Sequence, residues 1–141
     1  MKVLFIGGTG TSSCAVSVKR AARGDVLCLL NRGNRREEMP EGVELIQCDI
    51  GDEAAAARAL EGRRFDAVCD FIGFAPNQLE RDYRLFAGRT GQFLYISSAS
   101  AYHKPVRDYR ITEGTALANP YWAYSREKIA CEEYLMRMYR E

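Results

Sequence analysis

The segment Val3–Ser13 reads VLFIGGTGTSS and carries the strongest structural signal in this 141-residue chain. Its first residues are apolar and partly β-branched, which is typical of a buried strand in a parallel sheet, and Gly7 and Gly8 end that strand. The following residues begin a helix that Gly24 ends. A glycine-rich turn between a first strand and a first helix is where α/β proteins bind the phosphates of a dinucleotide.

Four residues of this turn are expected to lie against phosphate. Gly7 permits the tight turn out of the strand. Gly10 lets the main chain approach a pyrophosphate closely, and Thr11 follows where the N–H groups and the positive dipole end of the helix meet it. The spacing is G-x-x-G-x-x-S, so Ser13 stands where a third glycine usually packs helix against strand, and its hydroxyl can bond either a phosphate or the helix backbone. The alternative is a glycine turn in a doubly wound protein that binds no nucleotide.

Strand-like and helix-like segments alternate along the rest of the chain. We expect strands at 2–6, 26–30, 43–48, 65–71 and 92–96, and helices at 12–23, 52–60, 76–86 and 120–140. A polar loop, 99–119, precedes the last helix. The alternation predicts an α/β fold, a Rossmann-type doubly wound parallel sheet with strand order 3-2-1-4-5 and helices on both faces. We interpret residues 1–141 as one dinucleotide-binding domain.

Composition excludes several other classes of protein. The formal net charge of +1 gives no reason to expect nucleic acid or an anionic membrane as a partner. No apolar run approaches the ~20 residues of a membrane span, and the first strand is too short for a signal peptide, so we expect a cytoplasmic protein. The five cysteines are scattered and His103 is the only histidine, so we expect structural thiols and no metal site.

The end of the second predicted strand bears on the choice of cofactor. NAD-binding sites usually have an acidic residue there, whereas this chain has Asn31 and Arg32. The guanidinium of Arg32 suits the 2′-phosphate of NADP, with Arg35 or Arg36 in support, so NADP is the first choice and NAD the alternative. The alternative for these arginines is a solvated loop that recognises nothing.

Asp49 and Ile50 follow the third predicted strand, at the edge of the sheet where an adenine would lie. Asp49 can accept a hydrogen bond from the adenine amino group. Equally, Asp49 and Asp52 can cap the next helix. The sequence leaves these two roles open.

Tyr124 and Lys128 form a Y-x-x-x-K pair on the last predicted helix, where positions four apart share a face. A fixed cation beside a tyrosine favours the phenolate, which can then take a proton from an alcohol or return one to a carbonyl. Ser97 and Ser98 end the fifth predicted strand, where open α/β sheets bind ligands, and a hydroxyl there can hold the substrate oxygen. The alternative is that these serines only satisfy loop backbone groups.

These elements, in this order, resemble the extended short-chain dehydrogenase/reductases of the epimerase/dehydratase type, which act on nucleotide sugars. The likeness runs from Met1 to about Glu133. Asp66–Gly73 (DAVCDFIG) is similar to the family's fourth strand, whose final residues pass under the cofactor, and Phe93–Tyr102 (FLYISSASAY) is similar to its fifth-strand segment. The resemblance therefore implies that Phe71, Ile72, Gly73 and Ser97 lie at the cofactor, and that Ser98, Tyr124 and Lys128 are the catalytic residues.

The resemblance implies reversible hydride transfer with NAD(P), and it leaves epimerase, dehydratase and reductase open. The family continues into a sixth strand and a C-terminal substrate lobe, so we expect this chain to be a truncated member with weak or no turnover alone. In relatives, helices like 76–86 and 120–140 often pair across a two-fold axis, and a homodimer is one expectation. The apolar residues that could serve its interface are Tyr121, Ile129, Leu135, Met136 and Tyr139. The alternative is that part of this set faces the sheet. The competing interpretations are a non-catalytic NAD(P)-binding sensor and an RNA-binding relative of the same fold.

Overall fold

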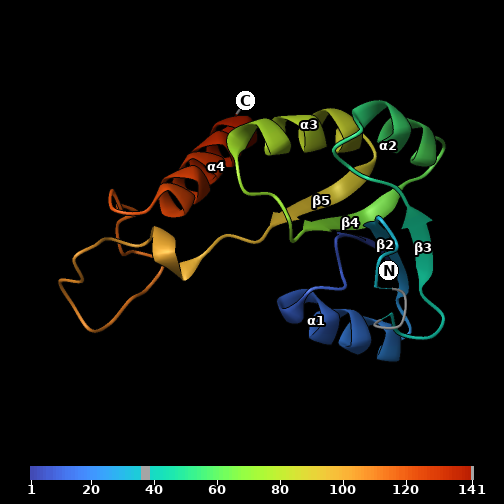
Figure 1. Ribbon diagram of the computed structural model, residues 1–141, viewed down its shortest axis with the longest axis horizontal. Coiled ribbons are helices and arrows are strands. Elements are labelled where there is room, and N and C mark those ends of the chain that lie inside the picture. Colours follow the sequence, from blue (N-terminus) through green and yellow to red (C-terminus); the bar gives the residue numbers. More distant parts are fainter. Residues whose placement is uncertain (36–38, 141) are drawn as a thin grey trace. The chain divides into compact units, whose positions relative to one another are not determined.

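A computed structural model describes residues 1–35 and 39–140, and its centre is a five-stranded parallel sheet (Figure 1). The spatial order of the strands is β3-β2-β1-β4-β5, with all neighbouring pairs parallel. The strands are β1 (Lys2–Ile6), β2 (Val26–Asn31), β3 (Glu44–Gln47), β4 (Phe65–Asp70) and β5 (Thr90–Tyr95). The predicted fold class and strand order are therefore confirmed.

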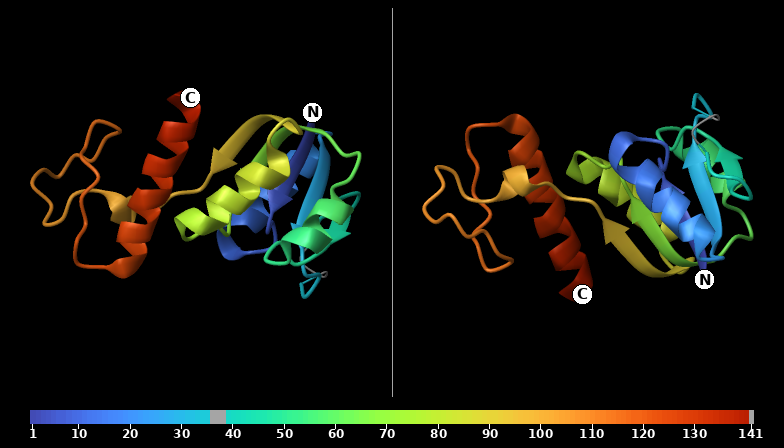
Figure 2. Two further views of the ribbon diagram at one scale, coloured as in Figure 1. Left: turned by 90° about the horizontal axis from the view of Figure 1, so that it is seen from above. Right: turned by 90° about the horizontal axis from the view of Figure 1, so that it is seen from below.

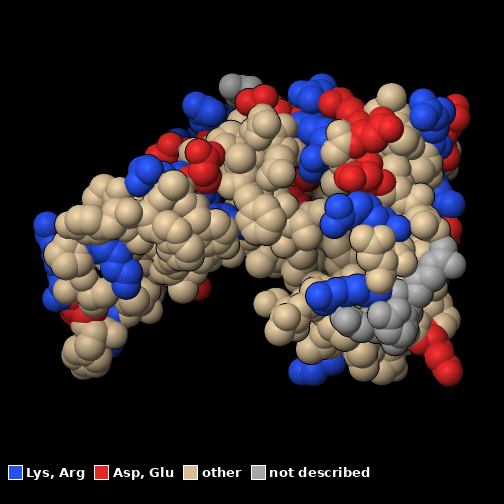
Figure 3. All heavy atoms as spheres, viewed as in Figure 1, with Lys and Arg blue, Asp and Glu red and all other residues tan. Residues whose placement is uncertain are grey.

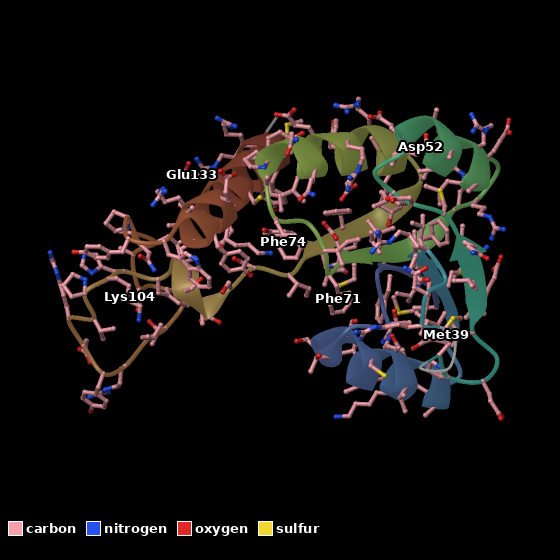
Figure 4. The ribbon with its side chains drawn as sticks, viewed as in Figure 1. Met39, Asp52, Phe71, Phe74, Lys104 and Glu133 are labelled. Carbon is pink, nitrogen blue, oxygen red and sulfur yellow. The ribbon has the colours of Figure 1, made fainter. Side chains whose placement is uncertain are left out.

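Helices cover both faces of this sheet because its central strands are apolar on both sides (Figures 1 and 2). The face covered by α2 (Glu53–Ala59) and the end of α3 (Pro76–Phe86) buries Leu4, Ile6 and Phe86, among others. The opposite face, which α1 (Thr11–Ala22) covers, buries Val3, Phe5 and Leu29, with Phe71 and Met39 packed against them (Figure 4). A sheet buried on both faces holds the carboxyl ends of its strands rigidly in place.

Most predicted boundaries agree with the structure to within one residue, and α3 and β1 agree in full. The main differences are at the C-terminal elements. β5 begins at Thr90 rather than 92, because Gly91 continues its extended backbone. The last helix, α4 (Ala123–Arg140), begins three residues later than predicted. Residues 120–122 form a turn before it, in which the side chain of Asn119 accepts a hydrogen bond from the N–H of Tyr121.

The chain forms two compact units, and the sheet belongs to the first, residues 1–72 and 81–96. The second unit consists of residues 73–80 and the chain from Ser97 onward. Among its described residues it contains the first part of α3, the 3-10 turn η2 (Ala99–Ala101) and α4. The predicted loop 99–119 is partly ordered by antiparallel bonds, since His103 and Lys104 donate to the carbonyl oxygens of Ala116 and Ala118. Among the described residues, no helix is long and apolar enough to cross a membrane.

Charged side chains of both signs alternate on the surface over α2 and the adjoining part of α3 (Figure 3). The guanidinium of Arg84 makes two hydrogen bonds, each 2.8 Å, to the two carboxylate oxygens of Glu53. These bonds hold the pKa of Glu53 below its usual value. Neither sign of charge therefore dominates this face of the sheet unit.

Candidate functional site

The glycine turn after β1 lies directly against the sheet. Gly7 and Gly8 have φ angles of +100° and +88°, which side chains rarely allow, and the N–H of Gly7 donates to the carbonyl of Leu30. A Cβ on Gly8 would lie 2.5 Å from Cδ2 of the buried Leu29. The sequence singled out Gly7 and Gly10 but not Gly8, although the Gly7-Gly8 doublet was a visible signal. Gly8 is the position where the turn approaches the sheet most closely.

Ser13 takes the place of the usual third glycine and fastens the first turn of α1. It is 3% exposed, and its hydroxyl accepts a hydrogen bond from the N–H of Gly10 at 2.9 Å. Gly10 and Thr11 are exposed, at the N-cap and the first position of the helix. The N–H groups of the first turn of a helix have no partner within the helix, so this end is suited to an anion.

A second contact links the middle of α1 to the glycine turn. The hydroxyl of Ser17, which is fully buried, donates to the carbonyl oxygen of Gly8 at 2.9 Å and to that of Ser13 at 3.0 Å. The turn is therefore held in its shape by side chains of the protein itself.

The end of β2 is bonded to the glycine turn through Asn31. Its amide Nδ2 donates to the carbonyl oxygen of Gly7 at 3.0 Å, and its Oδ1 accepts from the N–H of Gly33 at 2.8 Å. Arg32 is exposed, and its carbonyl oxygen accepts a hydrogen bond from the side chain of Gln47 at 3.2 Å. Arg35 donates to the carbonyl of Thr9 at 3.4 Å. Arg36 lies outside the described residues.

Asp49 and Asp52 have different roles after β3. The carboxylate of Asp52 accepts from the N–H of Ala55 at 3.0 Å, so Asp52 caps α2. Asp49 instead accepts from the N–H of Gly51 at 2.8 Å and is exposed. Ile50, which is 5% exposed, packs in the hydrophobic core, so its side chain anchors the loop that follows β3.

The end of β4 reaches the glycine turn from the other side. Phe71 packs edge-on against Phe5, with 5.0 Å between ring centroids (Figure 4). The Cγ2 atom of Ile72 lies 3.0 Å from where a Cβ on Gly7 would be. The ends of β1, β2 and β4 thus meet around Gly7, as expected for the carboxyl edge of a doubly wound sheet.

A buried pair of carboxyl groups supports the end of β4. Asp70, the last residue of the strand, and Asp82, on α3, are each 0% exposed. Oδ1 of Asp70 accepts from the N–H of Ile72 at 2.8 Å, and Oδ1 of Asp82 accepts from Arg81. Burial, and then the negative charge of Asp70, raises the pKa of Asp82 to about 7, while Arg81 acts in the opposite direction. A hydrogen bond between two carboxyl groups requires one proton, since ionised carboxylates only accept.

The second unit brings Tyr124 and Lys128 together with Gly73. Lys128 is 2% exposed, and its ammonium donates to the carbonyl oxygen of Gly73 at 2.7 Å. The same nitrogen lies 5.7 Å from the centroid of the Tyr124 ring and 5.0 Å from that of Phe74. The rings of Trp122 and Phe74 lie 4.8 and 6.1 Å from that of Tyr124. Tyr124 therefore has a cation and two aromatic neighbours.

Ser97 and Ser98 bond to different parts of the second unit. The hydroxyl of Ser97 donates to the carboxylate of Glu132 on α4. The hydroxyl of Ser98 accepts from the N–H of Ser100 at 3.2 Å and lies 2.9 Å from the Ser100 hydroxyl, which makes Ser98 the N-cap of η2. The sequence did not distinguish these two roles, because the partners Glu132 and Ser100 become neighbours only in the folded chain.

Comparison with known proteins places the chain in a family. It matches the model of the NAD dependent epimerase/dehydratase family over residues 3–141, so the chain belongs to that family. None of the curated protein sequences matches it. The predicted family is therefore confirmed.

Solved structures with the same fold include three UDP-glucose 4-epimerases. One is 19% identical, with a TM-score of 0.82 over 99% of this chain and 48% of its own. The enzyme from Thermus thermophilus, solved with NAD, is 24% identical, with a TM-score of 0.78 over 97% and 50%. The enzyme from Bifidobacterium longum, solved with NAD+ and UDP, is 18% identical, with a TM-score of 0.80 over 98% and 49%. The chain thus spans about half the length of these structures.

Proposed function

We propose that this chain is the dinucleotide-binding part of an enzyme that transfers hydride between NAD(P) and a hydroxyl or carbonyl carbon of a nucleotide sugar or a related substrate. The observation that carries the proposal is the pairing of Tyr124 with the buried ammonium of Lys128 on α4. The two groups lie on one face of α4, with Nζ 5.7 Å from the ring centroid, so a substrate bound there would meet a phenol able to exchange a proton and a fixed positive charge. Family membership and the exposed helix start at Gly10 and Thr11 support the same proposal.

In this proposal the sheet unit holds the dinucleotide. The N–H groups at Gly10, Thr11 and Ser13 meet the pyrophosphate. Asp49 and Ile50 border the adenine, and Phe71, Ile72 and Gly73 lie along the cofactor with Ser97. When bound, the nicotinamide accepts or gives up the hydride.

The Ser-Tyr-Lys residues carry the proton chemistry in this proposal. The hydroxyl of Ser98 donates a hydrogen bond to the substrate oxygen and orients it. Tyr124 takes the proton of a substrate hydroxyl as hydride leaves the same carbon, and it returns the proton when a carbonyl is reduced. The ammonium of Lys128, fixed on the same helix, bonds the nicotinamide ribose. Epimerisation, dehydration and net reduction share these proton and hydride steps.

The choice between NADP and NAD depends on Arg32. Its exposed guanidinium and the amide of Asn31, in place of a carboxylate, favour the 2′-phosphate of NADP. NAD is the alternative, and it is the cofactor named with several of the structures of similar fold.

Calorimetric titration with NADPH and NADH tests the cofactor proposal, with Arg32→Ala beside the wild type. We expect saturable NADPH binding that weakens about tenfold or more in the variant, because one charge-assisted pair contributes about 1.5–3 kcal/mol. Binding of NADH alone, unaffected by Arg32→Ala, would reject NADP and keep the dinucleotide site. A folded chain that binds neither would contradict the proposal.

The second candidate is a non-catalytic NAD(P)-binding sensor, which the same fold and glycine turn also allow. Tyr124→Phe separates it from an enzyme. The variant keeps the ring contacts with Trp122 and Phe74 but loses the hydroxyl, so it should abolish turnover and leave dinucleotide affinity unchanged. A sensor would have no turnover to lose.

A homodimer through helices 76–86 and 120–140 remains part of the proposal. Tyr121, Met136 and Tyr139 are exposed by 75%, 51% and 87%, which gives this part of the second unit apolar surface for a partner. Sedimentation equilibrium of the wild type and of a Met136→Glu variant tests it. A monomeric wild type would reject it.

A further inference from the structure

Asn119 is a buried side chain whose amide bonds in three directions. It is 7% exposed and directly precedes Pro120. Its Nδ2 donates to the carbonyl oxygen of Ser100 at 2.8 Å and to the hydroxyl of Ser125 at 3.3 Å. Its Oδ1 accepts from the N–H of Tyr121 at 3.2 Å. Three bonds fix the plane of the amide, so its orientation is not adjustable.

The two donor bonds join segments that carry different proposed catalytic groups. Ser100 is bonded through its N–H to the hydroxyl of Ser98, the cap of η2. Ser125, which is fully buried, follows Tyr124 in the first turn of α4. One amide group therefore connects the turn that holds Ser98 with the turn that holds Tyr124.

The chain between these turns is held only in part, by the antiparallel bonds of His103 and Lys104 to Ala116 and Ala118. Residues 105–114 are exposed throughout, and a long exposed loop has many accessible conformations. Asn119 stands at the end of this loop and bonds back to its beginning. The hydrogen bond from Ser97 to Glu132 is a second link between the segment before η2 and α4. It lies about two helical turns after Tyr124.

We propose that Asn119 is a positioning residue that sets the separation of Ser98 and Tyr124, an inference that rests on the proposed function. Proton transfer requires the substrate oxygen to reach both hydroxyls at hydrogen-bond distance, and an error of about 1 Å in such an arrangement lowers the rate about a hundredfold. The bond from Tyr121 to Oδ1 has a different purpose, since it only shapes the entry to α4.

Two variants separate the effect of the clamp, meaning the bonds of the Asn119 amide to Ser100 and Ser125, from its effect on the start of α4. Asn119→Asp keeps an oxygen for the N–H of Tyr121 and can accept from the Ser125 hydroxyl, but it loses the bond to the carbonyl oxygen of Ser100, because an ionised carboxylate only accepts. Asn119→Ala loses all three bonds without burying a charge. Asn77→Asp, at an exposed asparagine of the same unit, is the matched control for the change itself. Tyr124→Phe is the reference variant that lacks the hydroxyl proposed to transfer the proton.

Three quantities are measured in the full-length protein: kcat and KM with UDP-glucose as the probe substrate, the dissociation constant of NAD(P)H, and amide hydrogen exchange. Asn119→Asp and Asn119→Ala should both lower kcat by about ten- to a hundredfold, with KM and cofactor affinity within about twofold of wild type. Exchange should rise in peptides covering residues 98–102. Asn77→Asp should change none of these.

Several results would overturn the inference. One is wild-type kcat in Asn119→Asp, which would leave Asn119 with the helix entry alone. Another is amide hydrogen exchange at residues 98–102 that stays at the wild-type rate in both Asn119→Asp and Asn119→Ala. If Tyr124→Phe keeps full turnover, the proposed function fails and the catalytic meaning of Asn119 fails with it, whereas the exchange data still report whether the clamp exists.

Discussion

The ammonium of Lys128 donates a hydrogen bond of 2.7 Å to the carbonyl oxygen of Gly73, although only 2% of the lysine is exposed. A buried ammonium loses much of its hydration, and this bond together with the nearby rings of Phe74 and Tyr124 replaces part of it. The lysine thus joins the segment after β4 to α4. Its position is fixed by packing as well as by charge.

Lys128→Met tests whether this charge serves chemistry rather than stability. Methionine fills similar volume, so we expect the free energy of unfolding to change by no more than about 1–2 kcal/mol, since the lost bond to Gly73 is offset by relief from burying a charge. Turnover should fall at least a hundredfold. Lys104→Met, at a half-buried lysine of the same unit, should leave turnover unchanged. Urea unfolding and steady-state rates decide, and retained turnover in Lys128→Met would exclude the proposed role.

Asp82 makes the stability of the sheet unit depend on pH. Its folded pKa is about 7 against an ordinary value of 3.8, so the folded chain binds this proton more tightly than the unfolded chain. The stabilisation is complete below the unfolded value and is lost as the pH rises through the folded one, with a slope of about −1.4 kcal/mol per pH unit in between. We therefore expect the wild type to be more stable near pH ~5 than near pH ~8.

Asp82→Asn should remove this slope, because an amide holds its protons at every pH and can still accept from Arg81. Glu80→Gln, at an exposed carboxylate of the same helix, should keep it. The measurement is the free energy of urea unfolding at a series of pH values for the three proteins. Parallel curves for the wild type and Asp82→Asn would show that Asp82 does not titrate in this range.

Gly8→Ala should destabilise the chain more than Gly24→Ala, although both glycines have positive φ angles, +88° and +76°. Each substitution forces alanine into a conformation that costs about 1–2 kcal/mol. Only at position 8 does the new Cβ also meet another atom, Cδ2 of Leu29 at 2.5 Å, and overpacking adds about 1–3 kcal/mol. Nothing lies within 4 Å at position 24. Thermal unfolding of both variants checks the order, and adding Leu29→Val should recover part of the loss at position 8.

Asn31→Asp should move cofactor preference away from NADPH. The new carboxylate still accepts from the N–H of Gly33 but no longer donates to the carbonyl of Gly7, and it repels a 2′-phosphate. We expect the ratio of NADPH to NADH affinity to fall about tenfold or more in calorimetry at low salt. Asn34→Asp, exposed in the same loop, adds the same charge without touching the glycine turn. An equal loss in both variants would mean that net charge alone acts.

The fold followed from the sequence because its signals are local. Apolar strands, Gly7-Gly8 and the helix stop at Gly24 sit at fixed places along the chain, and the order of a doubly wound sheet follows from their alternation. The start of α4 did not follow, since Pro120 is a usual first helical residue. In the structure the side chain of Asn119 accepts from the N–H of Tyr121, and α4 begins only at Ala123.

The candidate site was predictable only where residue type reports on chemistry. Tyr124 and Lys128 share a helix face at a spacing visible in the sequence, and the structure brings them together. Asn119, Glu132 and the Asp70–Asp82 pair were not predicted, because their partners lie far away in the sequence. An aspartate at the end of a strand and another on an amphipathic helix give no sign that they meet in the core.

Ser13 has a consequence for how any anion binds at α1. Its hydroxyl already accepts the hydrogen bond that the N–H of Gly10 would otherwise give to a phosphate oxygen. The protein's own side chain thus holds the turn in place, so little chain entropy remains to be lost if an anion binds there. An anion that accepts from the N–H of Gly10 would therefore exchange one acceptor for another, the serine hydroxyl for an oxygen of the anion.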